Sequence, residues 1–440
     1  MSRKTFKRGG VHPPEMKHLS EDAAIERIEA PERVVLPLSQ HIGGPAKAVV
    51  KPGDYVLKGQ VVAEATGYVS VPIHASVSGT VKEIFMRATP LGRQCEHLVI
   101  DNDGKDAGVV TLGRDRDWQG MKRDELANLI QEGGLVGMGG AAFPTHVKLT
   151  PPPEAHIDTL IMNGVECEPF LTIDGRMMLE YPKEITEGIR ILKRALGVQR
   201  VIVGIEANKK QAFAAMRAAA RQDSDISVEM LEVKYPQGAE KQLIDALIKR
   251  KVPSGKLPLD VGVVVQNVTT AYMTYQAVAK STPLIERPLT VTGDGIERPT
   301  NMIVPIGISI GEVIVRQGLK EETRKIIMGG PMMGVAVFDP ELPVVKGTSG
   351  LLALIEGVET MSHPCIRCGR CIEVCPLAEH AVSIVAAVKE GRVEDYDKLH
   401  VMDCVECGSC AFQCPARRPL IHYTKLAKAE LAAWRAKHRK

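Results

Sequence analysis

The sequence predicts a multidomain α/β protein with a separate cysteine-rich module near its C-terminus, and three observations carry that prediction. The chain has 440 residues, which is too many for one hydrophobic core. Apolar, strand-like runs alternate with helical stretches across residues 120–285, a pattern that indicates βαβ units and a parallel sheet. Eight of the ten cysteines lie between Cys365 and Cys414, and such clustering is typical of metal binding.

The composition is that of an ordinary globular protein, with 44% apolar and 25% charged residues. The net charge of +3 is too small to indicate nucleic acid as a partner. No apolar run approaches the ~18 residues that a membrane span needs, and the N-terminal residues lack the apolar core of a secretory signal. We therefore expect a cytoplasmic protein with reduced thiols and no membrane span of its own.

The first predicted region, residues 1–115, contains short strands separated by turns. Residues 35–85 alternate apolar and polar side chains, with Gly-Asp and Ser-Gly turn signals. This segment resembles the hairpin repeat of biotinyl and lipoyl carrier domains, in which a lysine occupies a tight turn. Here the turn reads Thr66-Gly67-Tyr68, without a lysine to modify. We expect a barrel-sandwich scaffold rather than a swinging arm.

The second predicted region, residues 116–285, contains the alternating strands and helices. Ligands of parallel sheets bind beyond the carboxyl ends of the strands. Residues 286–350 are rich in Gly, Pro and β-branched residues and predict a small β domain with one helix near 310–325. Residues 351–425 hold the clustered cysteines, and residues 426–440 predict a basic C-terminal helix.

Two cysteine motifs share one spacing, CIRCGRCIEVCP and CVECGSCAFQCP. Both match the C-x₂-C-x₂-C-x₃-C-P run of bacterial ferredoxins, in which the fourth cysteine ligates the other of two [4Fe–4S] clusters. Zinc, the alternative, usually takes paired cysteines rather than a triplet with a remote fourth before proline. Cys95 and Cys167 fit neither motif and are expected to be free thiols. The predicted ligand sets are Cys365, Cys368, Cys371 with Cys414, and Cys404, Cys407, Cys410 with Cys375.

A glycine-rich loop, GGLVGMGGAAFPTHVKL, occupies residues 133–149. Its glycines let the backbone approach a ligand closely and offer N–H groups to an anion. Lys148 adds a point charge suited to a phosphate. The loop is not a P-loop, because no Gly-Lys-Ser/Thr follows. A flexible surface loop is the alternative.

This loop resembles the FMN-binding loop of the NADH-oxidising flavoprotein subunit of respiratory complex I. Further motifs of that subunit follow in the same order along this chain. Where complex I has arginines in the loop, this chain has Val136 and Met138. The matching positions are Gly134, Gly137, Gly139, Gly140, Phe143, Pro144, Thr145 and Lys148 in the loop, then Asn163, Glu166, Glu168 and Pro169, then Tyr235, Gly238 and Glu240, and finally Asn267.

The resemblance implies a Rossmann-like domain that binds FMN and NAD(H). It implies that Lys148 lies toward the FMN phosphate and Asn163 on the isoalloxazine side, while Glu168 lies beside the nicotinamide and Glu166 near the flavin edge. It further implies that three residues close the pocket, which are Tyr235, Glu240 and Asn267.

Five segments follow one another along nearly the whole chain, which are FKRGGVHPPEMK, the carrier-like hairpin, the glycine-rich loop, IIMGGPMMGVAV…KGTSGLLAL and the double cysteine motif. Their order resembles the RnfC family, the C subunits of the Rnf ion-translocating ferredoxin:NAD oxidoreductase complex. The segment near 286–335 is similar to the soluble-ligand-binding β-grasp domain of complex I. The resemblance implies a peripheral protein on the cytoplasmic face of the bacterial inner membrane. Its implied partners are integral membrane and iron–sulfur subunits, NAD(H), and ferredoxin through the complex.

Two alternatives remain open at this stage. The substitutions at Val136 and Met138 favour a flavin-free scaffold that keeps only the clusters as an electron wire. The absence of a spanning segment equally fits a soluble NADH dehydrogenase subunit. Flavin content separates the first alternative from the electron-exchanging flavoprotein, because a flavin has to stand between a two-electron nucleotide and one-electron clusters.

Overall fold

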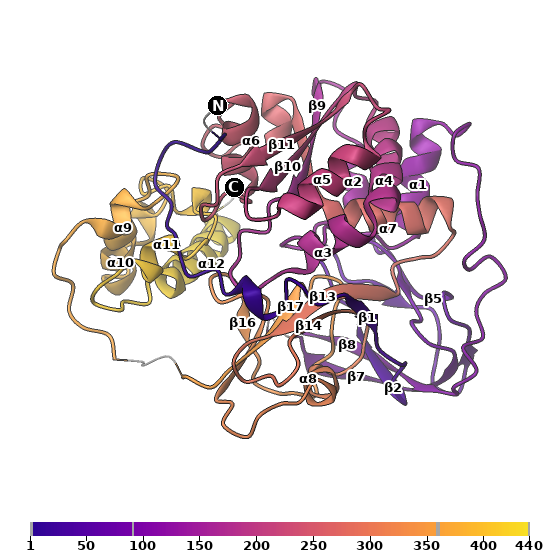
Figure 1. Cartoon of the computed structure of the whole chain (residues 1–440). Coiled ribbons are helices and arrows are strands. Elements are labelled where there is room, and N and C mark those ends of the chain that lie inside the picture. Colours follow the sequence, from indigo (N-terminus) through magenta and orange to yellow (C-terminus); the bar gives the residue numbers. More distant parts are fainter. Residues whose placement is uncertain (1–2, 90–91, 358–360, 439–440) are drawn as a thin grey trace.

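The computed structural model describes residues 3–89, 92–357 and 361–438 (Figure 1). Within these residues the strands form four sheets. Two are the antiparallel sheets of a barrel-sandwich, one is parallel, and one is mixed. The predicted α/β architecture is confirmed. The C-terminal cysteine module lies at one side of the molecule, on the left in Figure 1.

The barrel-sandwich forms because apolar side chains alternate along short strands and face one another. Its core includes Val34, Leu36, Leu98 and Ile100, all buried. The turn at residues 66–68 is docked, since the Tyr68 hydroxyl lies 2.5 Å from the Thr150 hydroxyl of the next domain. The strand order is β2 (Arg33–Pro37), β8 (Gln94–Asn102), β7 (Gly79–Ala88), β4 (Tyr55–Val56) in one sheet and β3 (Lys47–Ala48), β5 (Val61–Glu64), β6 (Ile73–His74) in the other.

The parallel sheet has the order β11 (Ile226–Leu231), β10 (Arg200–Glu206), β9 (Thr159–Gly164), β12 (Val263–Asn267). Helix α6 (Glu240–Ile248) packs on one face of this sheet. The other face is covered by α1 (Arg123–Glu132), α4 (Pro182–Leu196), α5 (Lys210–Ala219) and α7 (Val268–Ala279). Gly188 lets α4 and α7 meet, because a Cβ there would lie 1.8 Å from the Ala271 carbonyl oxygen. All four strands lie in residues 120–285, where the sequence alternates strand-like runs with helical stretches.

The mixed sheet has six strands, of which β1 comes from outside the predicted 286–350 domain and β17 begins at its last residue. Its order is β1 (Ile25–Arg27), β14 (Thr300–Pro305), β13 (Glu286–Thr292), β17 (Gly350–Leu354), β15 (Lys325–Met328), β16 (Val335–Ala336). The helix expected near 310–325 is α8 (Ile310–Arg316). It ends early because Gly318 takes a left-handed φ of 78° directly after it.

The segment before β1 does not join the barrel-sandwich. It contacts the parallel-sheet domain, the cysteine module and the mixed sheet in turn. Val11 exchanges backbone hydrogen bonds with Tyr235 of the parallel-sheet domain, and Gly10 N–H donates to the Val374 carbonyl of the cysteine module at 2.9 Å. Figure 1 shows this indigo segment running between the two units. A short 3₁₀ turn, Lys17–Leu19, then leads to the mixed sheet.

The cysteine module repeats one local structure. Gly369 and Gly408, with φ of 78° and 79°, precede the short helices α9 (Arg370–Glu373) and α11 (Ser409–Phe412). The predicted C-terminal helix is α12 (Leu420–His438), which packs on α10 (Ala381–Lys389). Further 3₁₀ turns are Pro258–Val261, Val393–Asp395 and Val401–Asp403. Across the described ranges, no helix is both long and apolar enough to cross a membrane.

Candidate functional site

Two asparagines mark the point where the parallel sheet reverses its strand order. Asn163 at the end of β9 is paired in register with Asn267 at the end of β12. The strand order changes direction between β9 and β12, and open α/β sheets bind ligands in that crevice. Asn267 caps α7 by accepting from the N–H groups of Thr269 and Thr270. Both predicted cofactor residues therefore lie side by side at the expected edge.

The glycine loop crosses this same edge between α1 and α2 (Thr145–Leu149). Gly137 N–H donates to the Phe143 carbonyl at 2.8 Å, so the loop folds back on itself with Gly140 at its exposed tip. Gly139 has to lack a side chain, because a Cβ would lie 2.8 Å from the Asn267 amide nitrogen. Gly134 has a φ of 70°, and a Cβ there would lie 2.7 Å from the Pro72 carbonyl. The glycines thus let the loop lie directly on the strand ends.

Lys148 and Glu240 stand on either side of these strand ends and form an ion pair. The Lys148 Nζ lies 2.8 Å from Glu240 Oε1 and 3.1 Å from the Val265 carbonyl. Their side chains are 31% and 37% exposed, so the pair faces the solvent side of the crevice. Asn163 donates to the Gly238 carbonyl at 2.8 Å, just before Glu240. The structure therefore brings together four predicted residues, which are Lys148, Asn163, Glu240 and Asn267.

The acidic turn is held by buried charges. Glu166, with a left-handed φ of 50°, accepts from the N–H groups of Asp174 at 2.6 Å and Gly175 at 3.3 Å, at the start of α3 (Ile173–Glu180). Its carboxylate lies 3.7 Å from Lys209. Burial raises the pKa of Glu166 to about 7. In this structure Glu166 supports the turn, and a place near the flavin edge stays a prediction.

Glu168 is covered by the loop 329–334. Its Oε1 accepts from the N–H groups of Met332 at 2.7 Å and Met333 at 3.0 Å. A Cβ on Gly330 would lie 2.1 Å from the Glu168 Cγ, so this loop needs its glycine there. Burial raises the pKa of the Glu168 carboxyl. Contact between Glu168 and a nicotinamide would require the loop to move aside, and that contact stays a prediction.

Tyr235 lies where the parallel-sheet domain meets the cysteine module. Its side chain is buried, and its hydroxyl donates to the Cys407 carbonyl at 2.6 Å. The Glu168 carboxyl also lies close enough to the Tyr235 side chain for each to influence the pKa of the other. A place for Tyr235 at the flavin pocket stays a prediction. The chain Glu168–Tyr235–Cys407 links the acidic turn to the second cysteine motif.

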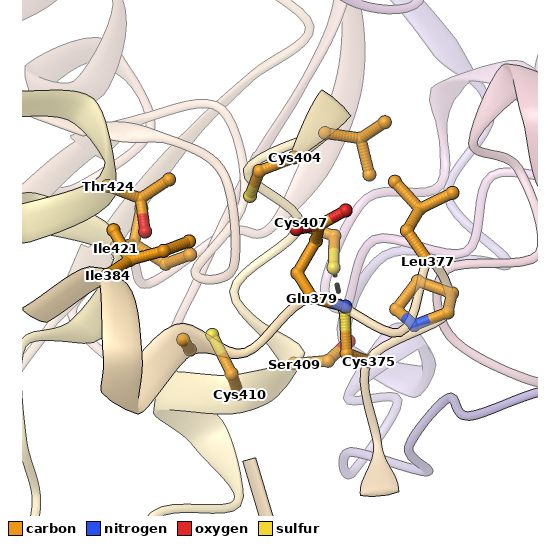
Figure 2. Close-up of a pocket in the computed structure, with 13 residues that line it drawn as sticks. Cys375, Leu377, Glu379, Ile384, Cys404, Cys407, Ser409, Cys410, Ile421 and Thr424 are labelled. Atoms are coloured by element: carbon orange, nitrogen blue, oxygen red, sulfur yellow. Dashed lines mark hydrogen bonds between the residues drawn. The ribbon is translucent and has the colours of Figure 1, made fainter. Parts of the chain in front are cut away.

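Four cysteines surround one cavity in the module, as Figure 2 shows. They are the first three cysteines of the second motif, Cys404, Cys407 and Cys410, and the last of the first motif, Cys375. Burial, followed by the nearby thiols, raises the pKa of Cys410 to about 12. This is the ligand set that the spacing predicts. The remaining walls of the cavity are largely apolar.

The other four motif cysteines gather at a second place. Burial raises the pKa of Cys371, and the thiols of Cys414, Cys368 and Cys365 raise it further. Cys365 and Cys368 are exposed, whereas the cysteines of the first-described set are buried or half-buried. The two groups are called the exposed set and the inner set below. The inner set is Cys375, Cys404, Cys407 and Cys410, and the exposed set is Cys365, Cys368, Cys371 and Cys414.

Both sets fit iron–sulfur clusters in their chemistry. Backbone N–H groups point at sulfurs of both sets, from Glu379 to Cys375 at 3.2 Å in the inner set and from Arg367 to Cys365 at 3.4 Å in the exposed set, and such donors stabilise thiolates. Within the described residues, no three His, Cys, Asp or Glu side chains form a group that could hold a single metal ion.

The two remaining cysteines lie outside both sets. Cys95 is buried in the barrel-sandwich, and Cys167 accepts a hydrogen bond from Gly238 N–H at 3.3 Å. Burial raises the pKa of both thiols, so both are held protonated and unreactive.

The sequence did not reveal several charged residues around the site. Lys17 is buried and donates to three backbone carbonyls of the acidic turn, those of Glu166, Glu168 and Leu171. Arg287 from β13 is buried below the glycine loop and donates to the Met138 carbonyl. The only signal for Lys17 was its place in the segment FKRGGVHPPEMK, and nothing in the sequence pointed to Arg287. The full group that was missed is Lys17, Asp174, Glu206, Lys209 and Arg287.

Three parts of the chain match known protein families. Residues 4–105 match the RnfC barrel sandwich hybrid domain. Residues 130–276 match the Nuo51 FMN-binding domain, and residues 364–417 match the 4Fe–4S dicluster domain. The fold and the site therefore define the class of the protein as an FMN- and iron–sulfur-dependent oxidoreductase subunit.

Curated relatives identify the family within that class. The chain is 43% identical to the C subunit of the proton-translocating ferredoxin:NAD(+) oxidoreductase complex of Clostridium ljungdahlii, over 96% of this chain and 93% of that protein. It is 41% identical to the C subunit of the Na(+)-translocating complex of Acetobacterium woodii, over 98% of each. The C subunit of the ion-translocating oxidoreductase complex of Rhodobacter capsulatus is 42% identical, over 97% of this chain and 83% of that protein. The chain belongs to this RnfC family, as its motifs predicted.

One solved structure is also similar in part. The NAD+-reducing [NiFe]-hydrogenase in its H2-reduced state matches with a TM-score of 0.49 and 20% identity, over 72% of this chain and 67% of that chain.

Proposed function

We propose that this protein exchanges electrons between NAD(H) and the two cysteine sets, through FMN held at the glycine loop, and that partner subunits couple this exchange to ferredoxin and to ion transport. The observation that supports the proposal most is spatial. The crevice at Asn163 and Asn267 and the inner cysteine set belong to units that meet at Tyr235 and Cys407. Nucleotide chemistry and one-electron chemistry can therefore be joined within one chain.

A bound FMN would supply the conversion between a two-electron hydride and single electrons. The residues of this chain would provide the rest. The glycine loop would present backbone N–H groups, and Lys148 would contribute a positive charge toward the phosphate. The asparagine pair would fix the plane of the ring at the strand ends. The inner set and the exposed set would each hold one cluster.

Anaerobic reconstitution tests this proposal in one experiment. The purified protein is expected to contain about eight irons in two [4Fe–4S] sets and one FMN, and NADH is expected to bleach the cluster absorbance. A colourless protein loaded with zinc would contradict the cluster assignment. A protein with full iron, no flavin and no response to NADH would favour the flavin-free electron-wire scaffold, which Val136 and Met138 motivate.

The place of the protein in the complex is a further part of the proposal. Its relatives are named as subunits of ion-translocating complexes, and no described helix of this chain could span a membrane. We propose that it lies on the cytoplasmic face of the inner membrane and is held there by integral membrane and iron–sulfur subunits.

High salt, or deletion of the integral subunits, is expected to release this protein into the soluble fraction, because partner contacts alone would hold it. The measurement is an immunoblot of membrane and soluble fractions. If the protein stays with the membrane when those subunits are missing, it has an attachment of its own. A variant with Lys425 and Lys437 changed to glutamine tests whether the basic helix α12 contributes.

Two substitutions on either side of the crevice are expected to give opposite results. Lys148→Ala should weaken FMN binding roughly ten- to a hundredfold, because it removes a charge-assisted contact and leaves Glu240 without its counter-charge. Glu168→Gln should keep FMN bound but slow the reduction of the clusters by NADH. Flavin content and NADH bleaching, measured on the same preparation, distinguish the two effects. Dithionite should reduce the clusters fully in both variants.

Lys210→Ala is the control, because it removes an exposed lysine at the start of α5 in the same domain, away from the glycine loop. It should retain FMN as well as the unaltered protein. Full flavin content and full NADH activity in Lys148→Ala would show that this loop does not cradle the cofactor.

A further inference from the structure

Arg287 is a buried arginine that donates a hydrogen bond to the backbone of the glycine loop. It lies near the start of β13, in the mixed sheet, and only 1% of its surface is exposed. Its Nη2 donates to the Met138 carbonyl at 2.6 Å, and its Nε donates to the Thr348 carbonyl. Two of its three nitrogens thus fix the backbone of the loop and of the segment before β17.

The third nitrogen of this guanidinium, Nη1, is buried and has no hydrogen-bond partner among the described residues. Asp174, the carboxylate that acts on it electrostatically, is already engaged. The Asp174 oxygens accept from the Asn267 amide at 2.7 Å and from the Thr269 hydroxyl at 2.5 Å. A buried charged donor without an acceptor is costly, so this group is suited to an acceptor that arrives with a ligand.

Arg287 contacts the part of the glycine loop that differs from the similar loop of complex I. Where the similar loop of complex I has arginines, this chain has the buried apolar side chains of Val136 and Met138. A guanidinium nevertheless reaches the loop at the Met138 carbonyl, delivered by a strand of another domain. Gly139, the next residue, lies on Asn267, so this charge stands beside the predicted cofactor crevice.

We propose that Arg287 is a cofactor-positioning residue that supplies the flavin site with a positive charge at the part of the loop where Val136 and Met138 stand in place of arginines. The inference rests on the proposed FMN site. Its ligand is an anionic group of the flavin, which is either the phosphate or the reduced ring. An arginine is suited to this task because it keeps its charge when buried and aims several N–H groups in fixed directions.

The test compares Arg287→Met and Arg287→Lys in the full-length protein with intact clusters. Arg298→Met is the matched control, because Arg298 is an exposed arginine in the connection between β13 and β14 that bonds to the Arg316 carbonyl. The measurements are the dissociation constants of FMN and of riboflavin and the midpoint potential of the bound flavin. Arg287→Met should weaken FMN binding roughly ten- to a hundredfold, Arg287→Lys several-fold, and Arg298→Met not at all.

The riboflavin measurement separates the two sources of negative charge. If Arg287 serves the phosphate, only FMN binding weakens and the midpoint potential is unchanged. If it serves the ring, both flavins bind more weakly and the midpoint potential falls, because the anionic reduced form loses its stabilising charge.

Unchanged dissociation constants and potential in Arg287→Met, with only a lower melting temperature, would overturn the inference and leave a structural role. If Arg287→Met does not fold, Arg287→Lys decides, since values equal to those of the unaltered protein for FMN affinity and potential would likewise overturn it. If the unaltered protein binds no FMN, the proposed function itself fails, and that outcome is distinct from a failure at Arg287.

Discussion

Replacing Cys407 with alanine is expected to abolish the reduction of the whole module by NADH while leaving one cluster that dithionite still reduces. Cys407 belongs to the inner set, and its carbonyl accepts the Tyr235 hydroxyl at the contact with the parallel-sheet domain. Gly408, the next residue, packs so tightly on the loop 329–334 that a Cβ would lie 2.8 Å from the Met332 carbonyl. Electrons from the crevice should therefore enter at the inner cluster.

Cys368→Ala is the matched variant, because Cys368 belongs to the exposed set. It should lose the exposed cluster and retain NADH-driven reduction of the inner one. Electron paramagnetic resonance after NADH and after dithionite measures both effects. If the protein without the inner cluster still passes NADH electrons to the exposed cluster at the normal rate, the order of the two clusters is wrong.

Lys17→Met is expected to lower the stability of the parallel-sheet domain by about 3–5 kcal/mol, the range for removing one partner from a buried ionic cluster. The Lys17 ammonium donates to three carbonyls of the acidic turn at 2.5–3.0 Å. It also lowers the pKa values of Glu166 and Glu206, which burial raises to about 7. Without it, two buried carboxyls keep only Lys209 as a nearby counter-charge.

The deficit should depend on pH in a defined direction. A carboxyl whose pKa is raised in the folded state binds a proton more readily there than in the unfolded chain, so its contribution to stability is present at low pH and lost as the pH rises through its folded pKa. Removing Lys17 raises these pKa values further. The loss of stability in Lys17→Met should thus be smaller near pH 5.5, where both carboxyls are protonated and only the hydrogen bonds to the three carbonyls are missing, and largest above pH 7.

Hydrogen exchange of β9 and β10 at the two pH values measures this deficit. Lys7→Met, on the same segment but exposed, is the control and should cost less than about 0.5 kcal/mol. Equal protection of Lys17→Met and the unaltered protein above pH 7 would contradict the assigned role of Lys17.

The parts of this protein that the sequence predicts well are those specified by local patterns. The cysteine spacing fixes which thiols gather, because a tight loop can wrap only its own triplet and the fourth cysteine has to come from elsewhere. The strands β9–β12 could be predicted because each is a short apolar run followed by a helix. Asn163 and Asn267 could then be placed together, since carboxyl ends of parallel strands meet at one edge.

The parts that the sequence did not predict depend on contacts between distant segments. Nothing near Arg287 indicates that its side chain will reach Met138, 149 residues away. The strand β1 joins a sheet whose other members begin at Glu286. Glu168 and Tyr235 were expected at the flavin pocket from a resemblance alone. The covering loop at 329–334 belongs to a different sheet and has no local signal of its own.

The segment that crosses three units also bears on how the molecule is made. Residues 3–20 are synthesised before Tyr235, Asn301 and Val374, the residues that bind them through Val11, Ser20 and Gly10. These contacts cannot form until most of the chain has been synthesised, and the contact with Val374 forms only after synthesis of the first cysteine motif has begun. These contacts can therefore be completed only late in synthesis, after the first cysteine motif has emerged. Deletion of residues 3–20 should give a protein whose domains are folded but whose inner cluster is incompletely bound.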